Sequence, residues 1–211
     1  MTWLSHAWPQ VWSLLLQHLA LAVPAILIAV VVATPLGMLA ARTKRIGSIL
    51  VASTALIYTV PALAMLVILP FIVGFPLRST ANVTTALALY GIALLVRTAT
   101  DAFSSVPSHV RTAALAQGVS PKQLLWKVDL PLAIPVLISG IRVVCVSTIG
   151  LVTIGALIGV PSLGTLFTDG FQRGIYAEVL SGIVLVVLLA LLFDALTLLI
   201  GRVLAPWEAK A

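Results

Sequence analysis

Residues 19–41 read LALAVPAILIAVVVATPLGMLAA, a run without a charged side chain that ends at Arg42. A helix over this run would be roughly 34 Å long, enough to cross the hydrocarbon core of a bilayer. Of the 211 residues in the chain, 61% are hydrophobic and only 9% are charged, whereas about a quarter are charged in a typical soluble domain. The sequence therefore predicts an all-α polytopic membrane protein. Its other long apolar runs cover residues 46–73, 79–96, 130–168 and 179–201.

This composition excludes a secreted disulfide scaffold, a nucleic-acid-binding domain and a soluble enzyme with a membrane anchor. The net charge of +6 is better explained by membrane topology, because basic residues gather in cytoplasmic loops. Cys145 is the only cysteine, so no disulfide can form within the chain. No Lys or Arg precedes Arg42, and we therefore expect no cleavable signal peptide.

The run from 130 to 168 decides the number of spans. It is too long for one span and too short for two spans with a turn, which would need about 44 residues. A single span there leaves nine of the twelve basic residues on the cytoplasmic side, as the positive-inside rule favours. We predict five spans, with six as the alternative, the N-terminus outside and the C-terminus inside. Residues 159–171 would then form a re-entrant or lateral segment at the outer face.

The chain divides into three parts. Residues 1–18 carry Trp3, Trp8 and Trp12 among polar residues, a composition that favours an interfacial helix on the outer face; the alternative is a simple lead-in to the first span. Residues 19–204 form the membrane domain, with a polar loop at 97–131, and residues 205–211 form a cytoplasmic tail. Within the run 46–73, prolines at 61 and 70 are expected to bend or end the helix.

The sequence offers no catalytic or metal site. The six acidic residues are scattered, and the three histidines lack the spacing of metal ligands. A phosphate-binding loop has Gly directly before its Lys, whereas the four lysines follow Thr43, Pro121, Trp126 and Ala209. We therefore expect no enzyme activity, no cofactor and no metal in this chain.

The loop at 97–131 carries the clearest functional signal. Pro107-Ser108 begins a short helix, with Ser108 as a candidate N-cap, and Gly118 supplies a left-handed stop. Ser120-Pro121 begins a second short helix, which is expected to end near Leu130-Pro131. The first helix presents one face of small, uncharged side chains, which permits close approach of a partner surface. The loop is either a cytoplasmic docking element or a hairpin lying against the membrane. The residues of that face are Val110, Ala113, Ala114 and Gln117.

The same loop resembles the EAA motif of binding-protein-dependent ABC transporter permeases. The family pattern is Glu-Ala-Ala, three residues, Gly, nine residues, Ile, any residue, Leu-Pro. Here Thr112-Ala113-Ala114, Gly118 and the stretch Val128-Asp129-Leu130-Pro131 keep that spacing, with Thr and Val in place of Glu and Ile. Within the family, the chain is most similar to the permeases for glycine betaine, carnitine and choline. Three shorter stretches carry this closer match: residues 60–64, 140–142 and 158–164.

The resemblance implies a type I importer fold in the bacterial plasma membrane with a cytoplasmic coupling helix. Two permease subunits, this chain and a second copy or a related permease, would form the pathway. Cytoplasmic P-loop ATPases would bind ATP and Mg and contact the coupling helices, and an external binding protein would deliver the substrate. The residues implied in ATPase coupling are Ala113, Ala114, Gly118, Pro121, Val128, Leu130 and Pro131.

Two charged residues lie inside apolar runs. Arg142 and Asp194 fall in antiparallel spans at depths that would place both in the cytoplasmic half, where they can form an ion pair. An ionisable residue at such depth is costly unless it is paired or hydrated. The pair is either a pathway element or a structural contact. Ser147, Thr148 and Thr153 could line the same pathway, or bond to their own helix carbonyls or to neighbouring spans.

We therefore predict the permease subunit of an ATP-driven importer for a small quaternary-amine osmoprotectant. One alternative keeps the mechanism and changes the cargo to an amino acid or another small zwitterion. A second alternative, from a different class, is an ion-coupled secondary carrier, in which Arg142 and Asp194 would be central.

Overall fold

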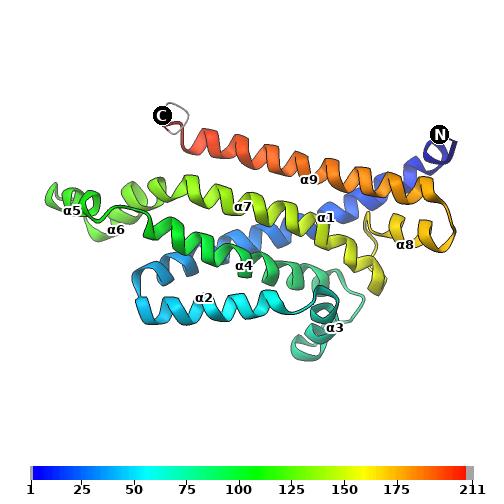
Figure 1. Cartoon of the computed structure of the whole chain (residues 1–211), viewed down its shortest axis with the longest axis horizontal. Coiled ribbons are helices and arrows are strands. Elements are labelled where there is room, and N and C mark those ends of the chain that lie inside the picture. Colours follow the sequence, from blue (N-terminus) through cyan, green and yellow to red (C-terminus); the bar gives the residue numbers. More distant parts are fainter. Residues whose placement is uncertain (1, 208–211) are drawn as a thin grey trace.

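The computed structural model describes residues 2–207, which fold into helices arranged along one long axis (Figure 1). No β-strand occurs within these residues. In chain order the helices are α1 (Thr2–Arg42), α2 (Lys44–Thr59), α3 (Ala62–Val73), α4 (Thr80–Ser104), α5 (Ser108–Ala116), α6 (Pro121–Leu124), α7 (Leu130–Val152), α8 (Thr165–Gln172) and α9 (Tyr176–Leu204). A π-helical turn, Leu125–Asp129, precedes α7, and a 3₁₀ turn, Thr153–Ile158, follows it.

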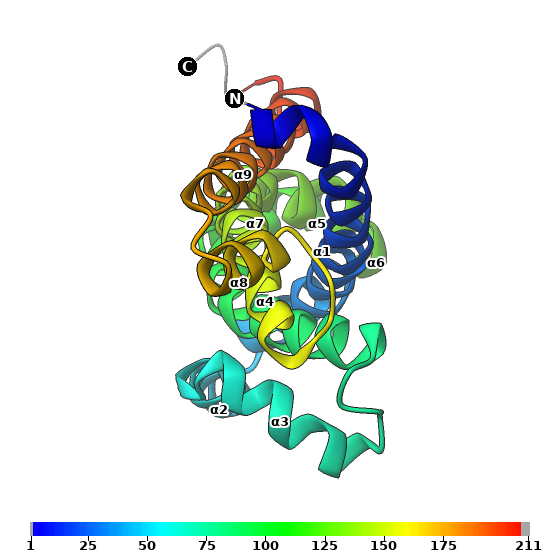
Figure 2. The same ribbon diagram turned by 90° about the vertical axis from the view of Figure 1, so that its right-hand side faces the viewer.

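Four helical segments are long and apolar enough to cross a membrane: Ala7–Arg42, Thr80–Ser104, Pro121–Ile158 and Tyr176–Leu204. The pair α2 and α3, bent by 109° at their junction, adds up to one more. This agrees with the five spans predicted from the sequence. Figure 2 shows α2 and α3 on the opposite side of the bundle from α9.

The two prolines of the α2–α3 region behave differently. Pro61 coincides with the bend, as predicted, and the hydroxyl of Tyr90 donates to the carbonyl of Val60 beside it. Pro70 does not end its helix, because α3 continues to Val73. A proline leaves the carbonyl four residues before it without a helical donor, and the buried amide of Asn82 donates to that carbonyl, on Leu66, at 2.9 Å.

The first helix is longer than the sequence predicted. α1 runs without a break from Thr2 to Arg42, although Pro9, Pro24 and Pro35 lie inside it. The expected interfacial segment at 1–18 is therefore continuous with the first span. At 1.5 Å per residue the helix is about 60 Å long, roughly twice the thickness of the hydrocarbon core. One part of α1 must therefore lie outside that layer.

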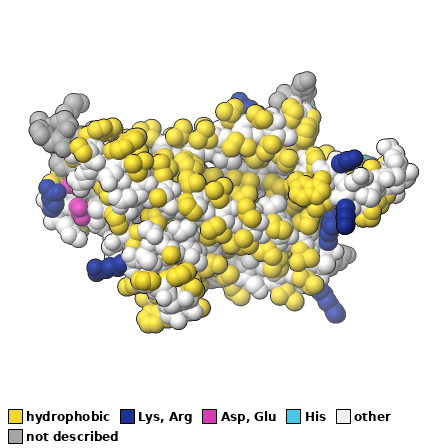
Figure 3. All heavy atoms as spheres, turned by 180° about the vertical axis from the view of Figure 1, so that it is seen from behind, with side chains coloured by type: hydrophobic (Ala, Val, Ile, Leu, Met, Phe, Trp, Pro, Cys, Tyr) yellow, Lys and Arg dark blue, Asp and Glu magenta, His cyan; other side chains and the backbone are white. Residues whose placement is uncertain are grey.

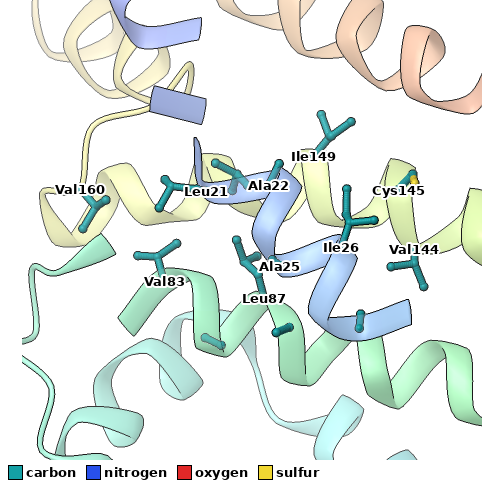
Figure 4. Packing of buried hydrophobic residues seen from close by; sticks show 14 of the residues in the cluster. Leu21, Ala22, Ala25, Ile26, Val83, Leu87, Val144, Cys145, Ile149 and Val160 are labelled. Carbon is teal, nitrogen blue, oxygen red and sulfur yellow. The ribbon is translucent and has the colours of Figure 1, made fainter. Parts of the chain in front are cut away.

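The core lies between α1, α4 and α7, where small residues let the helices approach closely. Figure 4 shows Leu21, Ala22, Ala25 and Ile26 facing apolar side chains from α4 and α7. A Cβ on Gly91 of α4 would lie 2.6 Å from the Cβ of Ala29 on α1, so only glycine fits this crossing. Small residues at helix contacts are typical of membrane bundles, where close packing replaces the hydrophobic effect as the driving force.

The segment after α7 confirms that the run 130–168 holds a single span. Gly159 has a left-handed backbone (φ 83°), and α8 has only eight residues, too few to cross a bilayer. The irregular backbone between them is satisfied by protein groups. The buried Ser162 hydroxyl donates to the carbonyl of Val152 and accepts from the N–H of Gly164. Such internal partners permit irregular backbone at membrane depth.

The two ends of the long axis differ. The N-terminal end of α1 lies near α8, whereas the C-terminal end of α9 lies at the end that carries α5 and α6 (Figure 1). Lys and Arg side chains gather mainly towards the ends, and the surface between them is largely hydrophobic (Figure 3). Of the predicted tail, residues 208–211 lie outside the described part of the chain.

Candidate functional site

The loop at 97–131 begins with α5, a helix of nine residues. Ser108 is its first helical residue and not its N-cap, so that prediction was wrong. Pro107 occupies the cap position with extended backbone angles (φ −64°, ψ 135°), and its carbonyl accepts from the N–H of Val110 at 3.2 Å. The fixed φ of proline already suits this position, which moves the helix start by one residue. The carbonyl of Ser108 instead accepts from the Thr112 hydroxyl at 3.0 Å.

Gly118 ends α5 as the sequence predicted. Its φ is 86°, in the left-handed region. The N–H of Gly118 donates to the carbonyl of Leu115 at 3.0 Å, and the N–H of Val119 donates to that of Ala114 at 3.1 Å. These two bonds form a Schellman motif, which satisfies the last carbonyls of a helix and reverses the chain. Ala114 of the EAA-like motif thus supports the turn that directs the next helix.

The second helix, α6, begins with the expected cap. The Ser120 hydroxyl accepts from the backbone N–H of Gln123, and the Gln123 side chain accepts from the N–H of Ser120, each at 3.3 Å. Pro121 follows at the first helical position, where its missing N–H costs nothing. The reciprocal cap fixes the direction in which α6 leaves the turn.

The second helix does not end near Leu130-Pro131, and that prediction was wrong. It continues through the π-helical turn into α7, so that Pro121–Ile158 is one membrane-span candidate. The N–H of Leu130 donates to the carbonyl of Leu125, five residues back. The wider turn gives room for the ring of Pro131, which in an α-helix would collide with the carbonyl of Lys127. The loop is therefore joined to α7 without a flexible break.

The loop lies at one end of the bundle (Figure 1), and most residues of α5 are exposed. No residue of α5 is buried; Ala113 is exposed and Ala114 is half-buried. Gly118 and Pro121 are also exposed, whereas Val128, Leu130 and Pro131 are half-buried. A groove of about 320 Å³ lies beside the π-helical turn. Its lining consists of Val110, Lys127, Val128, Pro131, Leu132 and Trp207.

A charged cluster beneath this surface was not found from the sequence. The carboxylate of Asp129, only 2% exposed, accepts from Arg111 Nε at 2.7 Å and from Arg42 at 3.0 Å. Arg111 also donates to the carbonyl of Phe103, at the end of α4, at 2.8 Å. The cluster therefore joins α5 to the ends of α1, α4 and α7. The acidic residue inside the Val128–Pro131 stretch was the available signal.

The two charged residues of the membrane interior are paired, which the sequence alone had left open. Arg142 on α7 contacts Asp194 on α9 through two bonds, Nε to one carboxylate oxygen and a terminal nitrogen to the other, each at 2.7 Å. The Arg142 side chain is 37% exposed and that of Asp194 is 27% exposed. The pair lines a groove of about 320 Å³ together with Ser139, Val143, Val146 and Ser147.

The three hydroxyl residues named with this pair lie in different places. Ser147 lines the groove beside Arg142 and Asp194. Thr148 is 2% exposed within the bundle. Thr153 donates to the carbonyl of Gly150, one turn earlier, which is the local bonding that Ser and Thr often adopt in helices. Of the three, only Ser147 shares a groove with the ion pair.

Comparison with known proteins places the chain in a family. The sequence model described as "Binding-protein-dependent transport system inner membrane component" matches residues 33–210. The chain belongs to this family. It is therefore the permease component of an ABC importer, and it is an inner membrane protein.

Characterised relatives match over most of their length. The osmoprotectant import permease protein OsmW of Salmonella typhimurium is 32% identical over 92% of this chain and 91% of its own. The glycine betaine/carnitine/choline transport system permease protein OpuCD of Bacillus subtilis is 31% identical over 92% of this chain and 84% of its own. The choline transport system permease protein OpuBD of the same organism is 30% identical, with 92% and 85% covered.

Solved structures share the fold. An inward-facing form of the MetNI methionine ABC transporter has a chain with a TM-score of 0.79 and 21% identity, over 90% of this chain and 93% of that one. A chain of an amino acid ABC transporter solved with histidines has a TM-score of 0.70 and 18% identity, over 99% and 97%. The predicted type I importer permease fold is thus confirmed.

Proposed function

We propose that this permease imports a small quaternary-amine osmoprotectant such as glycine betaine, carnitine or choline. The observation that carries the proposal is the match to permeases for these compounds at 30–32% identity over 92% of the chain.

We further propose that a separate P-loop ATPase docks on α5 and α6. The support is the exposed, small-residue surface around Ala113 and Gly118 and the rigid continuation of this loop into α7. ATP and Mg would bind to that partner. An extracytoplasmic binding protein would deliver substrate at the opposite end, near α8, and a second copy or a related permease would complete the pathway. The N-terminus would then be outside and the C-terminus in the cytoplasm.

The partner proposal is tested by tagged purification in mild detergent followed by mass spectrometry. A P-loop ATPase in a fixed ratio to this chain is expected. A chain that purifies alone and drives uptake from an ion gradient would support the secondary-carrier alternative instead. The comparison preparation is the same chain carrying Ala113→Trp. A large side chain on the exposed face of α5 should reduce the amount of ATPase recovered, relative to the unchanged chain, without altering the helix bundle.

The substrate is tested by uptake in proteoliposomes that contain the purified complex and its binding protein. Labelled glycine betaine, carnitine, choline, methionine and histidine are compared, each with ATP and with a non-hydrolysable analogue. ATP-dependent uptake of a quaternary amine is expected. Uptake of an amino acid in place of the quaternary amines would overturn the substrate assignment while leaving the importer mechanism intact.

A further inference from the structure

We propose that Asp129 is a positioning residue of the coupling loop. Its carboxylate fixes the orientation of α5 on the cytoplasmic ends of α1, α4 and α7, so that these three helices follow the loop when the loop moves. The inference rests on the proposed docking of an ATPase at α5. It adds to that function the contact by which movement of the loop reaches the spans.

The carboxylate of Asp129 lies between α5 and the end of α1, two helices that are not adjacent in the chain. Each oxygen of Asp129 has its own partner: one accepts from Arg111 on α5 and the other from Arg42 at the end of α1. Arg111 uses a second nitrogen to reach the carbonyl of Phe103 on α4. A guanidinium holds its donors in a rigid plane. Arg111 therefore fixes α5 both to Asp129 and to the end of α4.

Few other contacts hold α5. The helix has nine residues and buries none of them. A helix of this length is marginal by itself in water and depends on contacts outside it. The Arg111 side chain is 32% exposed, whereas Asp129 is 2% exposed, so the inner end of this contact is largely shielded from water. The cluster is therefore the main fixed point of the first coupling helix.

Asp129 is the residue on which the cluster depends most, because it carries the only negative charge among the three side chains. Asp129 is one negative group between two positive groups, Arg42 and Arg111. Removal of its charge leaves two guanidiniums facing each other without a counter-ion, and like charges at close range repel. The same change at Asp101 provides a matched control, because Asp101 is an exposed acidic residue near the same end of α4.

The first test measures the position of α5 directly. Spin labels are attached at exposed positions 117 and 104, on the end of α5 and the end of α4, in a Cys145→Ala background. Labelled chain is diluted with unlabelled chain so that distances between subunits do not contribute. We expect a narrow distance distribution that broadens in Asp129→Asn and stays narrow in Asp129→Glu and Asp101→Asn. An Asp129→Asn distribution as narrow as that of Asp101→Asn would overturn the proposal.

The second test measures coupling in the complex of permease, ATPase and binding protein. We expect Asp129→Asn to reduce the amount of substrate transported per ATP hydrolysed by about tenfold, as loss of one charge-assisted contact permits. Hydrolysis itself should persist. An unchanged ratio in Asp129→Asn would overturn the proposal. If this variant does not fold, Arg111→Lys replaces it in both tests, because lysine keeps the charge but cannot reach both partners. The same broadened distances and the same loss of transport per ATP are then expected, and unchanged values would overturn the proposal.

The two tests separate this inference from the proposed function. If no ATPase accompanies the chain, the docking proposal fails, and the spin-label distances still report whether Asp129 positions α5. If the ATPase is present and the distances do not change, the positioning role fails while the docking proposal stands.

Discussion

Replacement of Gly118 by valine should weaken the coupling of ATP hydrolysis to substrate transport, and backbone strain alone should be the cause. Gly118 has φ 86°, and a Cβ built on it would have no neighbour within 4 Å, so a side chain there meets no steric barrier. The left-handed conformation costs about 1–2 kcal/mol for a residue with a β-carbon. If the backbone relaxes, the two Schellman bonds to Leu115 and Ala114 are lost with it. A cost of this size shifts the balance between two turn conformations by about 5- to 30-fold.

Gly174→Val provides the matched control for this strain. Gly174 lies between α8 and α9, has φ 67° and also has no neighbour within 4 Å of an added Cβ, so the substitution carries a similar backbone cost outside the coupling loop. Both variants should reach the membrane in normal amounts. In proteoliposomes, we expect Gly118→Val to hydrolyse ATP with reduced substrate uptake and Gly174→Val to keep the normal ratio. Equal ratios in the two variants would refute the argument that the turn orients the docking helices.

Three further predictions concern the spans. Asp194→Asn should lower the melting temperature in detergent because it leaves Arg142 unpaired, and the exchanged pair Arg142→Asp with Asp194→Arg should recover part of the loss; no recovery would mean that pairing is not the cause. Gly91→Val should separate α1 from α4 and cost about 1–3 kcal/mol, seen as aggregation in size-exclusion chromatography, whereas Gly150→Val, which meets no neighbour within 4 Å, should remain monodisperse. Asn82→Ala removes the amide contacts to the carbonyls of Leu66 and Leu77 and should accelerate hydrogen exchange in α3 and in the connection from α3 to α4; unchanged exchange in both would contradict the role assigned to the amide.

The sequence predicted the spans and the turn between α5 and α6 well, because both depend on local chemistry. The thickness of the bilayer's hydrocarbon core sets the length of an apolar run. The turn at Gly118 and Ser120 depends on residues adjacent to them in sequence. The sequence also identified Arg142 and Asp194 as candidate partners, because charges at membrane depth have few partners to choose from, but it left their pairing open.

The cluster at Asp129 could not be found in the same way. A carboxylate near the membrane surface can be solvated by water, so the sequence does not require a partner for it. Its partners, Arg42 and Arg111, lie 87 and 18 residues away along the chain. They meet only because the ends of α1, α4 and α7 pack together around Ala99, Phe103 and neighbouring apolar side chains. The burial that makes Asp129 critical is thus a product of tertiary packing.

The prolines show most clearly where local sequence stops being informative. Pro61, Pro70 and Pro131 each remove one backbone donor, yet the first coincides with a bend, the second lies in a continuing helix and the third follows a π-helical turn. The outcome depends on what the surroundings offer to the backbone. The Asn82 amide replaces the missing donor at α3, and the wider turn makes room for the ring before α7. A helix in a membrane continues past a proline when a partner for the freed carbonyl, or space for the ring, is supplied from elsewhere in the fold.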